Sequence, residues 1–261
     1  MELISIIIPA YNEEEIIGEV VGGIKKIMEG DYEILVVDDG SVDRTEEVAE
    51  KAGARVIKHP YNIGNGAAVK TGIRAAKGEI LVTMDGDGQH SPEDIPKLLQ
   101  DIGKYDMVVG ARSKDSETKV HRNFANKIYN LFATYVAGGK IHDLTSGFRA
   151  VKTHIAKRFV YLLPNTFSYP STITLSLIRA GYSVKYEPIR VRSRTGKSKI
   201  RLFSDGLRFF LIMFKIATLF SPMKIFLPSS LSLIFLGIGY YFYTFINFNR
   251  FTNMSLLLIV S

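Results

Sequence analysis

Apolar and polar residues follow two different periods along the N-terminal part of the chain. Short apolar runs rich in β-branched residues alternate with stretches in which apolar residues recur at helical spacing. The apolar runs cover residues 3–8, 32–37, 54–58, 79–84 and 105–110. This alternation predicts an α/β domain built on a mainly parallel sheet.

Polar residues stand where the predicted helices begin. Asp43 and Glu46 have the spacing of a capping box, and the pair Ser91-Pro92 is typical of a helix start. In parallel sheets the functional loops follow the carboxyl ends of the strands. Residues 9–15, 38–43 and 85–90 occupy that place, so we expect the functional groups there.

The C-terminal part is apolar over a much longer distance. Residues 225–249 carry no charge, and about 20 helical residues suffice to cross the hydrocarbon core of a bilayer. We therefore expect one spanning helix. A second apolar run opens at Met254 and the sequence stops at Ser261, so we expect the chain to end inside a second membrane helix.

Basic residues predict the orientation of this span. Only Arg250 follows it closely, whereas five basic residues precede it: Lys199, Arg201, Arg208, Lys215 and Lys224. The N-terminus lacks the features of a secretory signal. We therefore expect an integral membrane protein whose N-terminal domain faces the cytoplasm.

Two segments combine aromatic, apolar and basic residues at helical spacing, residues 119–139 and 201–224. Such amphipathic helices lie either at a membrane surface or on the core of their own domain. Both readings remain open for the first segment. The second leads directly into the predicted span, which favours the membrane interface.

Composition narrows the chemistry. The chain has 261 residues, 46% of them hydrophobic, which is enough for one α/β core with an appendage. It has no cysteine, so disulfides, thiolate metal sites and cysteine nucleophiles are excluded. A net charge of +7 suits an anionic partner such as nucleic acid, a phosphate substrate or acidic lipid, and does not choose among them.

The sequence Asp85-Gly86-Asp87 places two carboxylates after an apolar strand with one glycine between them. Mg²⁺ and Mn²⁺ prefer carboxylate, phosphate and water oxygens, so this pair predicts a metal shared with a diphosphate. Gln89 offers a further oxygen nearby. An acidic turn rich in glycine is the alternative.

Two other segments have weaker signals. Asp38-Asp39-Gly40-Ser41 is typical of a turn or helix cap, although either aspartate is also suited to accept hydrogen bonds from a base or ribose. Residues 64–68 are rich in glycine and alanine and precede Lys70, so their backbone amides are open to a phosphate. They lack the spacing of the dinucleotide fingerprint.

The combination of motifs is more specific than its parts. Pro9-Ala10-Tyr11-Asn12-Glu13, then Val37-Asp38-Asp39-Gly40-Ser41, then the stretch from Met84 to His90 resemble family 2 glycosyltransferases with the GT-A fold. Residues 109–112 (Val-Gly-Ala-Arg) and 143–149 (Asp-Leu-Thr-Ser-Gly-Phe-Arg) look like the dolichyl- or polyprenyl-phosphate sugar synthase branch. The resemblance covers nearly the whole chain.

This resemblance implies roles by position. The donor nucleotide would be bound by Pro9, Ala10, Tyr11, Glu13, Asp38, Asp39, Asp85 and Lys197, and the metal by Asp85, Asp87 and Gln89. Arg112 and Arg122 would hold the acceptor phosphate, and Arg194 would reach the diphosphate from a basic loop over residues 192–199. Asn126 stands where the family often has a serine, which leaves its role open. Lys197 and Lys199 are equally suited to lipid headgroups or solvent.

The implied reaction is inverting transfer of one sugar from a nucleotide-sugar to a polyprenyl phosphate, with Mg²⁺ or Mn²⁺ as the cofactor. A lipid monophosphate, with a second pKa of about 6, is ionised and needs no protein base. The implied domains are a cytoplasmic GT-A domain over residues 1–200, an interfacial helix over 201–224 and a transmembrane region over 225–261. Membrane lipids are expected partners, as is a second copy of the chain, because two-span members of this branch often assemble.

Three alternatives compete with this interpretation. A processive polysaccharide synthase would carry a Gln-x-x-Arg-Trp signature, and the chain has no tryptophan. An idle nucleotide-sugar-binding scaffold is disfavoured by the presence of both Asp85 and Asp87. A nucleic-acid binder is disfavoured because no binding motif is recognisable. The donor stays open among GDP-mannose, UDP-glucose and UDP-N-acetylglucosamine, and the short tail looks more like that of the two-helix glucosyltransferases.

Overall fold

A computed structural model describes residues 3–113, 141–166, 168–191 and 221–248 of the chain. It also describes single positions or pairs within 131–138 and 211–218, and residue 253. The chain divides into two compact units, Met1–Ile212 and Met213–Ser261. The N-terminal unit contains the sheet, and the C-terminal unit contains one long described helix.

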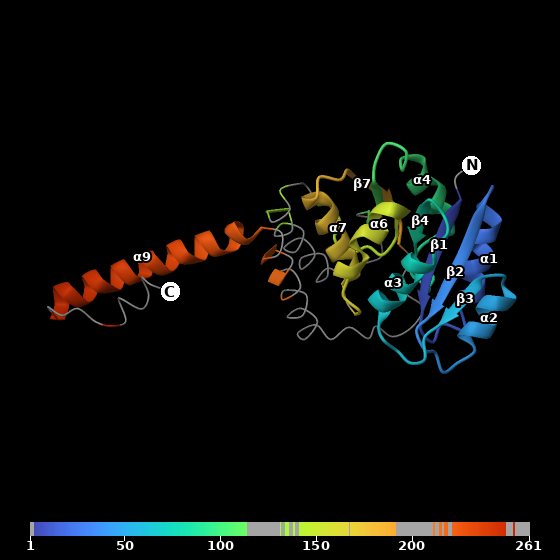
Figure 1. Ribbon diagram of the computed structural model, residues 1–261, viewed down its shortest axis with the longest axis horizontal. Helices are drawn as coiled ribbons and strands as arrows, with labels where there is room; N and C mark the ends of the chain where they lie inside the picture. Colours follow the sequence, from blue (N-terminus) through green and yellow to red (C-terminus); the bar gives the residue numbers. More distant parts are fainter. Residues whose placement is uncertain are drawn as a thin grey trace. The chain divides into compact units, whose positions relative to one another are not determined.

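Within the described residues of the N-terminal unit, seven strands form one sheet in the order β3-β2-β1-β4-β6-β5-β7. Figure 1 labels the neighbours β3, β2, β1 and β4. All neighbours pair in parallel except β6, which is antiparallel to both β4 and β5. The strands are β1 Ile4–Ala10, β2 Tyr32–Asp38, β3 Arg55–Lys58, β4 Ile80–Thr83, β5 Met107–Arg112, β6 Arg149–Lys152 and β7 Val184–Ile189. The five strands predicted from the sequence are confirmed.

Helices cover both faces of the sheet (Figure 1). The α-helices described in this unit are α1 Ile17–Ile27, α2 Thr45–Lys51, α3 Asn65–Ala75, α4 Ile95–Gln100, α6 Thr153–Phe159 and α7 Tyr169–Arg179. Two 3₁₀ turns, η1 Pro92–Asp94 and η2 Val160–Leu162, precede α4 and follow α6. The start predicted at Ser91-Pro92 is thus confirmed, with a 3₁₀ turn before the α-helix.

Strand residues alternate between two cores, because successive side chains of a strand point to opposite faces. Ile6 and Ile8 of β1 pack with α1, α2 and α4, whereas Ile7 packs with α3, α6 and α7. All three isoleucines are fully buried. The mainly parallel, doubly covered sheet explains why the strands read as continuous apolar runs in the sequence.

The capping box predicted at Asp43 and Glu46 is wrong. Helix α2 begins at Thr45, and the Asp43 carboxylate accepts from the Thr45 amide (3.0 Å) and from the Glu14 amide (3.2 Å). Glu46 instead forms an ion pair with Lys58. Asp43 therefore connects the loop after β1 to the start of α2, and these hydrogen bonds hold its pKa below the usual range although burial opposes this.

Strand order determines where a ligand can bind. The chain runs outward from β1 through β2 to β3 and then returns to β4 on the other side of β1. Such a reversal separates the loops after the two central strands and opens a crevice at their carboxyl ends. The loops after β1, β2 and β4 all lie at this edge.

The C-terminal unit contains α9 Pro222–Phe248, a helix of 27 residues. Among the described residues it is the one helix long and apolar enough to cross a membrane, with a mean hydropathy of 1.6 over its best window. Large apolar side chains along it are exposed, including Phe235 and Ile246. The segments 119–139 and 201–224, predicted as amphipathic helices, lie largely outside the described residues.

Candidate functional site

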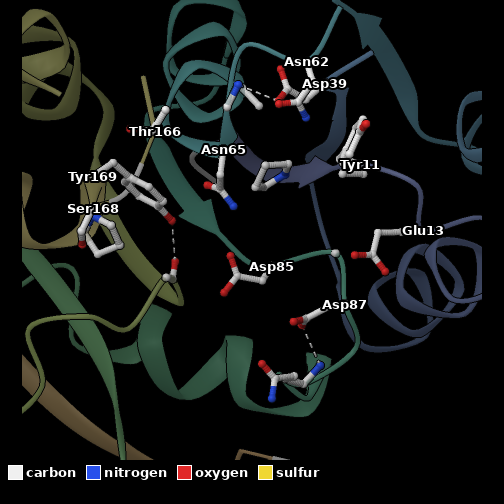
Figure 2. A pocket seen from close by; sticks show the side chains of 18 of the residues that line it. Tyr11, Glu13, Asp39, Asn62, Asn65, Asp85, Asp87, Thr166, Ser168 and Tyr169 are labelled. Carbon is white, nitrogen blue, oxygen red and sulfur yellow. Dashed lines mark hydrogen bonds between the residues drawn. The ribbon is translucent and has the colours of Figure 1, made fainter. Parts of the chain in front are cut away.

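A pocket of about 500 Å³ opens at the carboxyl edge of the central strands. Its wall comes from the loops after β1, β2, β3 and β4, the start of α3, the loop before β6 and the residues at the start of α7. The lining residues are Pro9, Ala10, Tyr11, Glu13, Asp39, Asn62, Gly64, Asn65, Ala68, Asp85, Gly86, Asp87, Gln89, Thr145, Gly147, Thr166, Ser168, Tyr169 and Pro170. Figure 2 shows the pocket from close by.

Most of the described residues that the sequence assigned to a donor and a metal lie in this one pocket. They are Pro9, Ala10, Tyr11, Glu13, Asp39, Asp85, Asp87 and Gln89. They come from three loops separated by up to 80 positions in sequence, and parallel strand order brings the loops together. Their shared location is a finding, and their individual roles stay predictions.

The acidic loop after β4 presents its carboxylates to the pocket. In Figure 2, Asp85 extends into the middle of the open space and Asp87 lies next to it on the same loop. The loop starts where the Met84 amide donates to the Ile7 carbonyl (3.0 Å). Asp87 Oδ1 accepts from the Gln89 amide (3.2 Å), which closes the turn.

The Asp85 carboxylate lies close to the loop before β6. A Cβ atom built on Gly147 would lie 2.8 Å from Asp85 Oδ2, so a side chain at residue 147 would require this carboxylate to shift. His90 lies on another side, with Nδ1 3.7 Å from Asp85 Oδ2, and its ring stacks on Phe148 (centroids 5.1 Å apart). The backbone at residue 147 therefore sets the position of Asp85.

Gly147 is itself held by two side chains. Its carbonyl accepts from Thr83 Oγ1 (2.7 Å) and from Tyr169 Oη (3.2 Å), the second of which is drawn in Figure 2. Burial raises the pKa of Tyr169 well above its ordinary value, so the hydroxyl keeps its hydrogen at neutral pH. Strand β4 and helix α7 thus fix the loop that touches Asp85.

A buried arginine joins the same loop to α7. Arg149 is fully buried and donates to the Pro170 carbonyl (3.1 Å), to Thr174 Oγ1 (3.0 Å) and to the Ser146 carbonyl. Its guanidinium carbon lies 5.9 Å from the centre of the Tyr169 ring. Burial lowers the pKa of Arg149, because desolvation disfavours the charged form.

The two aspartates after β2 have different environments. Asp39 lines the pocket, and its carboxylate accepts from the amides of Ile63 (3.1 Å) and Gly64 (2.8 Å). Asp38 does not line it. Asp38 Oδ1 accepts from the Ser41 amide (2.9 Å) inside the turn, and its Oδ2 lies 3.8 Å from Lys58 Nζ.

Residues 64–68 form the start of α3, but their glycines have a second use. A Cβ on Gly66 would lie 2.2 Å from the Pro164 carbonyl oxygen, and the Ala67 amide donates to the Asn165 carbonyl (2.8 Å). Glycine is therefore required here for the close approach of residues 164–166. Gly64 and Asn65 still line the pocket, so part of this helix start remains open to a ligand.

Arg112 lies at the end of β5 and is paired with Asp143. Its Nε and Nη2 donate to the two carboxylate oxygens of Asp143, each at 2.8 Å. Burial disfavours the charged guanidinium, yet the hydrogen bonds and the charge of Asp143 outweigh it and raise the pKa of Arg112. Arg112 is not among the residues that line the pocket, whereas Thr145, whose hydroxyl it also contacts, is.

Three predicted site residues, Arg122, Arg194 and Lys197, lie outside the described residues, as does Asn126. Their assignments stay predictions.

A sequence model described as "Glycosyl transferase family 2" matches residues 5–159, which contain the strands β1 to β6 and most of the pocket. The chain belongs to glycosyl transferase family 2. It is a glycosyltransferase, as the motifs indicated. A second model, described as "GtrB C-terminal hairpin", matches residues 221–261 of this family 2 enzyme and thus includes α9.

Curated relatives agree with this family. An uncharacterized protein of Methanocaldococcus jannaschii is 37% identical over 197 residues, 72% of this chain and 80% of the relative. A dolichyl-phosphate hexose transferase of Haloferax volcanii is 35% identical over 206 residues, 78% of this chain and 89% of the relative. A dolichol-phosphate mannosyltransferase of Pyrococcus furiosus is 35% identical over 213 residues, 76% of this chain and 59% of the relative.

Solved structures share the fold. Glucosyl-3-phosphoglycerate synthase of Mycobacterium tuberculosis, in complex with Mn²⁺, UDP and glucosyl-3-phosphoglycerate, superposes with a TM-score of 0.68 at 20% identity. The match covers 83% of the family 2 chain and 80% of the synthase. The GT-A-like architecture expected from the sequence is confirmed, as a mostly parallel sheet with helices on both faces.

The oxygen atoms that line the pocket are suited to bind a cation together with a ligand. Among the residues that the structure describes, no group of three or more His, Asp or Glu side chains could hold a metal alone. The pocket does offer two carboxylates, of Asp85 and Asp87, and the amide side chain of Gln89. Oxygen atoms of this kind suit Mg²⁺ or Mn²⁺ when a diphosphate and water complete the shell.

Some pocket residues were not predicted from the sequence. Asn62, Thr166, Ser168, Tyr169 and Pro170 carry no motif of their own. The signal available was the Ser-x-x-Ser spacing of a helix start at Ser168, whose side chain accepts from the Ser171 amide. That spacing predicts where α7 begins and says nothing of the pocket that it closes.

Proposed function

We propose that this family 2 enzyme transfers one sugar from a nucleotide-sugar to a polyprenyl or dolichyl phosphate, with inversion and with Mg²⁺ or Mn²⁺. The observation that carries the proposal is that Asp85, Asp87, Tyr11 and Asp39 all line the same pocket. The names of the dolichyl-phosphate relatives, at 35% identity, support the lipid phosphate as acceptor.

The donor would lie across the pocket. Asp39 and Tyr11 lie on one side in Figure 2 and would bind the nucleoside, while Asp85 and Asp87 lie at the centre and would bind the diphosphate through the cation. Pro9, Ala10 and Glu13 also line the pocket and would bind the nucleoside with them. The M. tuberculosis synthase, a fold neighbour, has been solved with Mn²⁺ or Mg²⁺ and UDP, which supports this kind of ligand.

The cation, when bound, neutralises charge that develops on the departing diphosphate. The chain's own part is to hold Asp85 and Asp87 in place through the turn at Gln89 and the packed backbone of Gly147. The acceptor phosphate is an anion near neutral pH and attacks without a protein base. Binding and orientation of the two substrates would therefore supply most of the rate enhancement.

The acceptor phosphate would bind to cationic side chains beside the donor. Arg112 stays charged because Asp143 compensates for its burial, and its contact with Thr145 places it next to the pocket wall. We assign Arg122 to the same phosphate and Arg194 with Lys197 to the donor diphosphate. Asp38 supports the donor indirectly, by holding the turn that carries Asp39.

The hydrocarbon chain of the lipid acceptor would account for the apolar helix α9. An exposed apolar helix of 27 residues suits a bilayer, where the lipid substrate is found. We place the catalytic domain at residues 1–200 on the cytoplasmic face, an interfacial helix at 201–224 and the membrane region at 225–261. Membrane lipids are then partners, as is a second copy of the chain.

A transfer assay tests this function. Full-length protein in detergent is given GDP-mannose, UDP-glucose or UDP-N-acetylglucosamine, a polyprenyl phosphate, and Mg²⁺ or Mn²⁺. We expect one donor to yield a lipid with one sugar, and we expect chelator or Asp87→Asn to lower the rate by at least about 100-fold. Longer products would indicate a polymerase. Donor binding without any glycolipid would indicate a scaffold.

The absence of cysteine makes topology testable. Single cysteines replace Lys104 or Asn253, both exposed, in a chain that has no other thiol. In intact cells, a membrane-impermeant maleimide should label Asn253→Cys and should label Lys104→Cys only after lysis. Labelling of Lys104→Cys in intact cells would contradict the cytoplasmic assignment.

A further inference from the structure

His59 follows strand β3 and is buried, with 7% of its surface exposed. Both ring nitrogens have partners. Nδ1 lies 2.7 Å from Asp39 Oδ1, and Nε2 lies 2.9 Å from Thr71 Oγ1 on α3. The histidine therefore links the aspartate of the pocket wall to the helix whose start forms another part of that wall.

The partners define which atoms donate. An ionised carboxylate only accepts hydrogen bonds, so Nδ1 carries a hydrogen and donates to Asp39. The hydroxyl of Thr71 is able to donate or to accept, so it satisfies Nε2 in either protonation state of the ring. The ring is thus fixed in orientation from both ends.

Asp39 in turn connects the segments around the nucleoside side of the pocket. Its amide donates to the Ala10 carbonyl (2.9 Å), and its carboxylate accepts from the amides of Ile63 and Gly64. Of these, Ala10 and Gly64 line the pocket, as does the neighbouring Asn62. A rotation of the Asp39 side chain would therefore release the amides of Ile63 and Gly64, the second of which belongs to the pocket wall.

The distribution of donors also selects one oxygen for a ligand. Asp39 Oδ1 already accepts from His59 and from Ile63, whereas Gly64 is the one donor to Oδ2 among the residues that the structure describes. A carboxylate oxygen has two lone pairs. Oδ2 is thus the atom with capacity for a further donor, such as a ring N–H or a ribose hydroxyl.

We propose that His59 is a positioning residue of the donor pocket, which holds the Asp39 carboxylate so that Oδ2 accepts from the nucleoside of the donor. The proposal rests on the proposed function in that its ligand is a nucleoside diphosphate. A buried histidine that only stabilises the core would show no such link to binding.

The first test replaces the ring by one of similar size. His59→Phe removes both hydrogen bonds, and loss of a hydrogen bond to a charged group weakens an interaction by about 10- to 100-fold. We expect the dissociation constant of UDP or GDP, measured with Mn²⁺ by calorimetry, and the KM for the sugar nucleotide to rise by that factor. The kcat should stay within about threefold.

Two substitutions by amide side chains test the two hydrogen bonds of the ring separately. The side-chain nitrogen of His59→Asn replaces Nδ1 and still donates to Asp39, whereas that of His59→Gln replaces Nε2 and does not. We expect the asparagine variant to recover most of the nucleotide affinity and the glutamine variant to resemble His59→Phe. Thr71→Val, which keeps the bond to Asp39, should lose only a few-fold. The exposed His154, changed to asparagine, serves as the control.

Several outcomes would overturn the proposal. Unchanged nucleotide affinity in His59→Phe or in His59→Gln is one, and equal losses in the asparagine and glutamine variants with a matching fall in melting temperature is another. If His59→Phe does not fold, the comparison of His59→Asn with His59→Gln tests the proposal by itself. Binding requires no lipid acceptor, so wild-type protein that binds UDP or GDP but forms no glycolipid would refute the proposed function and leave this inference intact.

Discussion

Arg112 donates from Nε and Nη2 to the two carboxylate oxygens of Asp143, and both hydrogen bonds are 2.8 Å long. They connect the end of β5 to the loop that contains Thr145 and Gly147. Asp143 Oδ1 also accepts from the amides of Thr145 and Ser146. One ion pair thus shapes the loop that touches Asp85. Its two members differ in exposure, with 21% of the Arg112 side chain and 7% of the Asp143 side chain accessible.

This asymmetry predicts unequal effects of removing either partner. Arg112→Ala leaves a buried carboxylate without its cation, which costs about 2–4 kcal/mol. Asp143→Asn should cost less, because Arg112 still reaches water and the amide oxygen still accepts. We expect the melting temperature of the full chain to fall by about 5–10 °C in the first variant and by less than half of that in the second. Arg74→Ala, at an exposed position, should have no effect.

Gly147 gives a prediction about activity with little effect on folding. In Gly147→Ala the new Cβ would lie 2.8 Å from Asp85 Oδ2, which forces the carboxylate out of its place. We expect sugar transfer to fall by about 100-fold or more, while the melting temperature changes by a few degrees. Gly103→Ala is the matched control, because no atom lies within 4 Å of its Cβ position. Full activity in Gly147→Ala would show that Asp85 does not need this position.

Asp106 predicts how stability depends on pH. Hydrogen bonds from Lys152 (2.9 Å) and from the amide and hydroxyl of Ser183 join β5, β6 and β7, and they lower the pKa of Asp106 to about 2. Because the folded-state pKa lies below the unfolded value, this stabilisation is complete above pH about 4 and is lost as pH falls toward 2.

Asp106→Asn should therefore lower the free energy of unfolding by about 1–2 kcal/mol at pH 7. The difference from wild type should shrink steadily in melting experiments at successively lower pH below about 4. Asp31→Asn, at an exposed position, provides the comparison. A difference that stays constant down to pH 3 would contradict the assigned cause.

The sequence predicts β1, β2, β4 and β5 because they are mostly buried and read as apolar runs. It predicts β3, a half-exposed edge strand, from the β-branched pair Val56-Ile57. It does not predict β6 or β7. Strand β6 has four residues, of which Arg149 and Lys152 are charged, and the burial of Arg149 depends on acceptors from α7. Strand β7 contains Pro188, which is tolerated because β7 lies at the edge of the sheet. Both signals depend on neighbours that are distant in sequence.

The same reason limits what the sequence says about the site. The loops after β1, β2 and β4 each follow a predicted strand, so the strand order brings Asp39 and Asp85 to the same edge of the sheet. Tyr169 reaches the pocket only because helix α7 packs beside the loop before β6, which no local pattern records. The part of the pocket formed by the loops after β1, β2 and β4 was therefore predictable, and the wall formed by α7 was not.

Tyr169 and Thr83 predict a non-additive effect on the same wall. Both hydroxyls donate to the Gly147 carbonyl, so Tyr169→Phe or Thr83→Val alone leaves that oxygen with one donor. The double variant leaves a buried carbonyl without either, which costs more than the two single losses together. We expect each single variant to lower transfer by about 3- to 10-fold, and a coupling of about 1 kcal/mol in a double-mutant cycle of transfer rates. Tyr161→Phe, on the exposed face of η2, controls for the loss of a tyrosine hydroxyl. Strictly additive effects would mean that the Gly147 carbonyl does not transmit these contacts to Asp85.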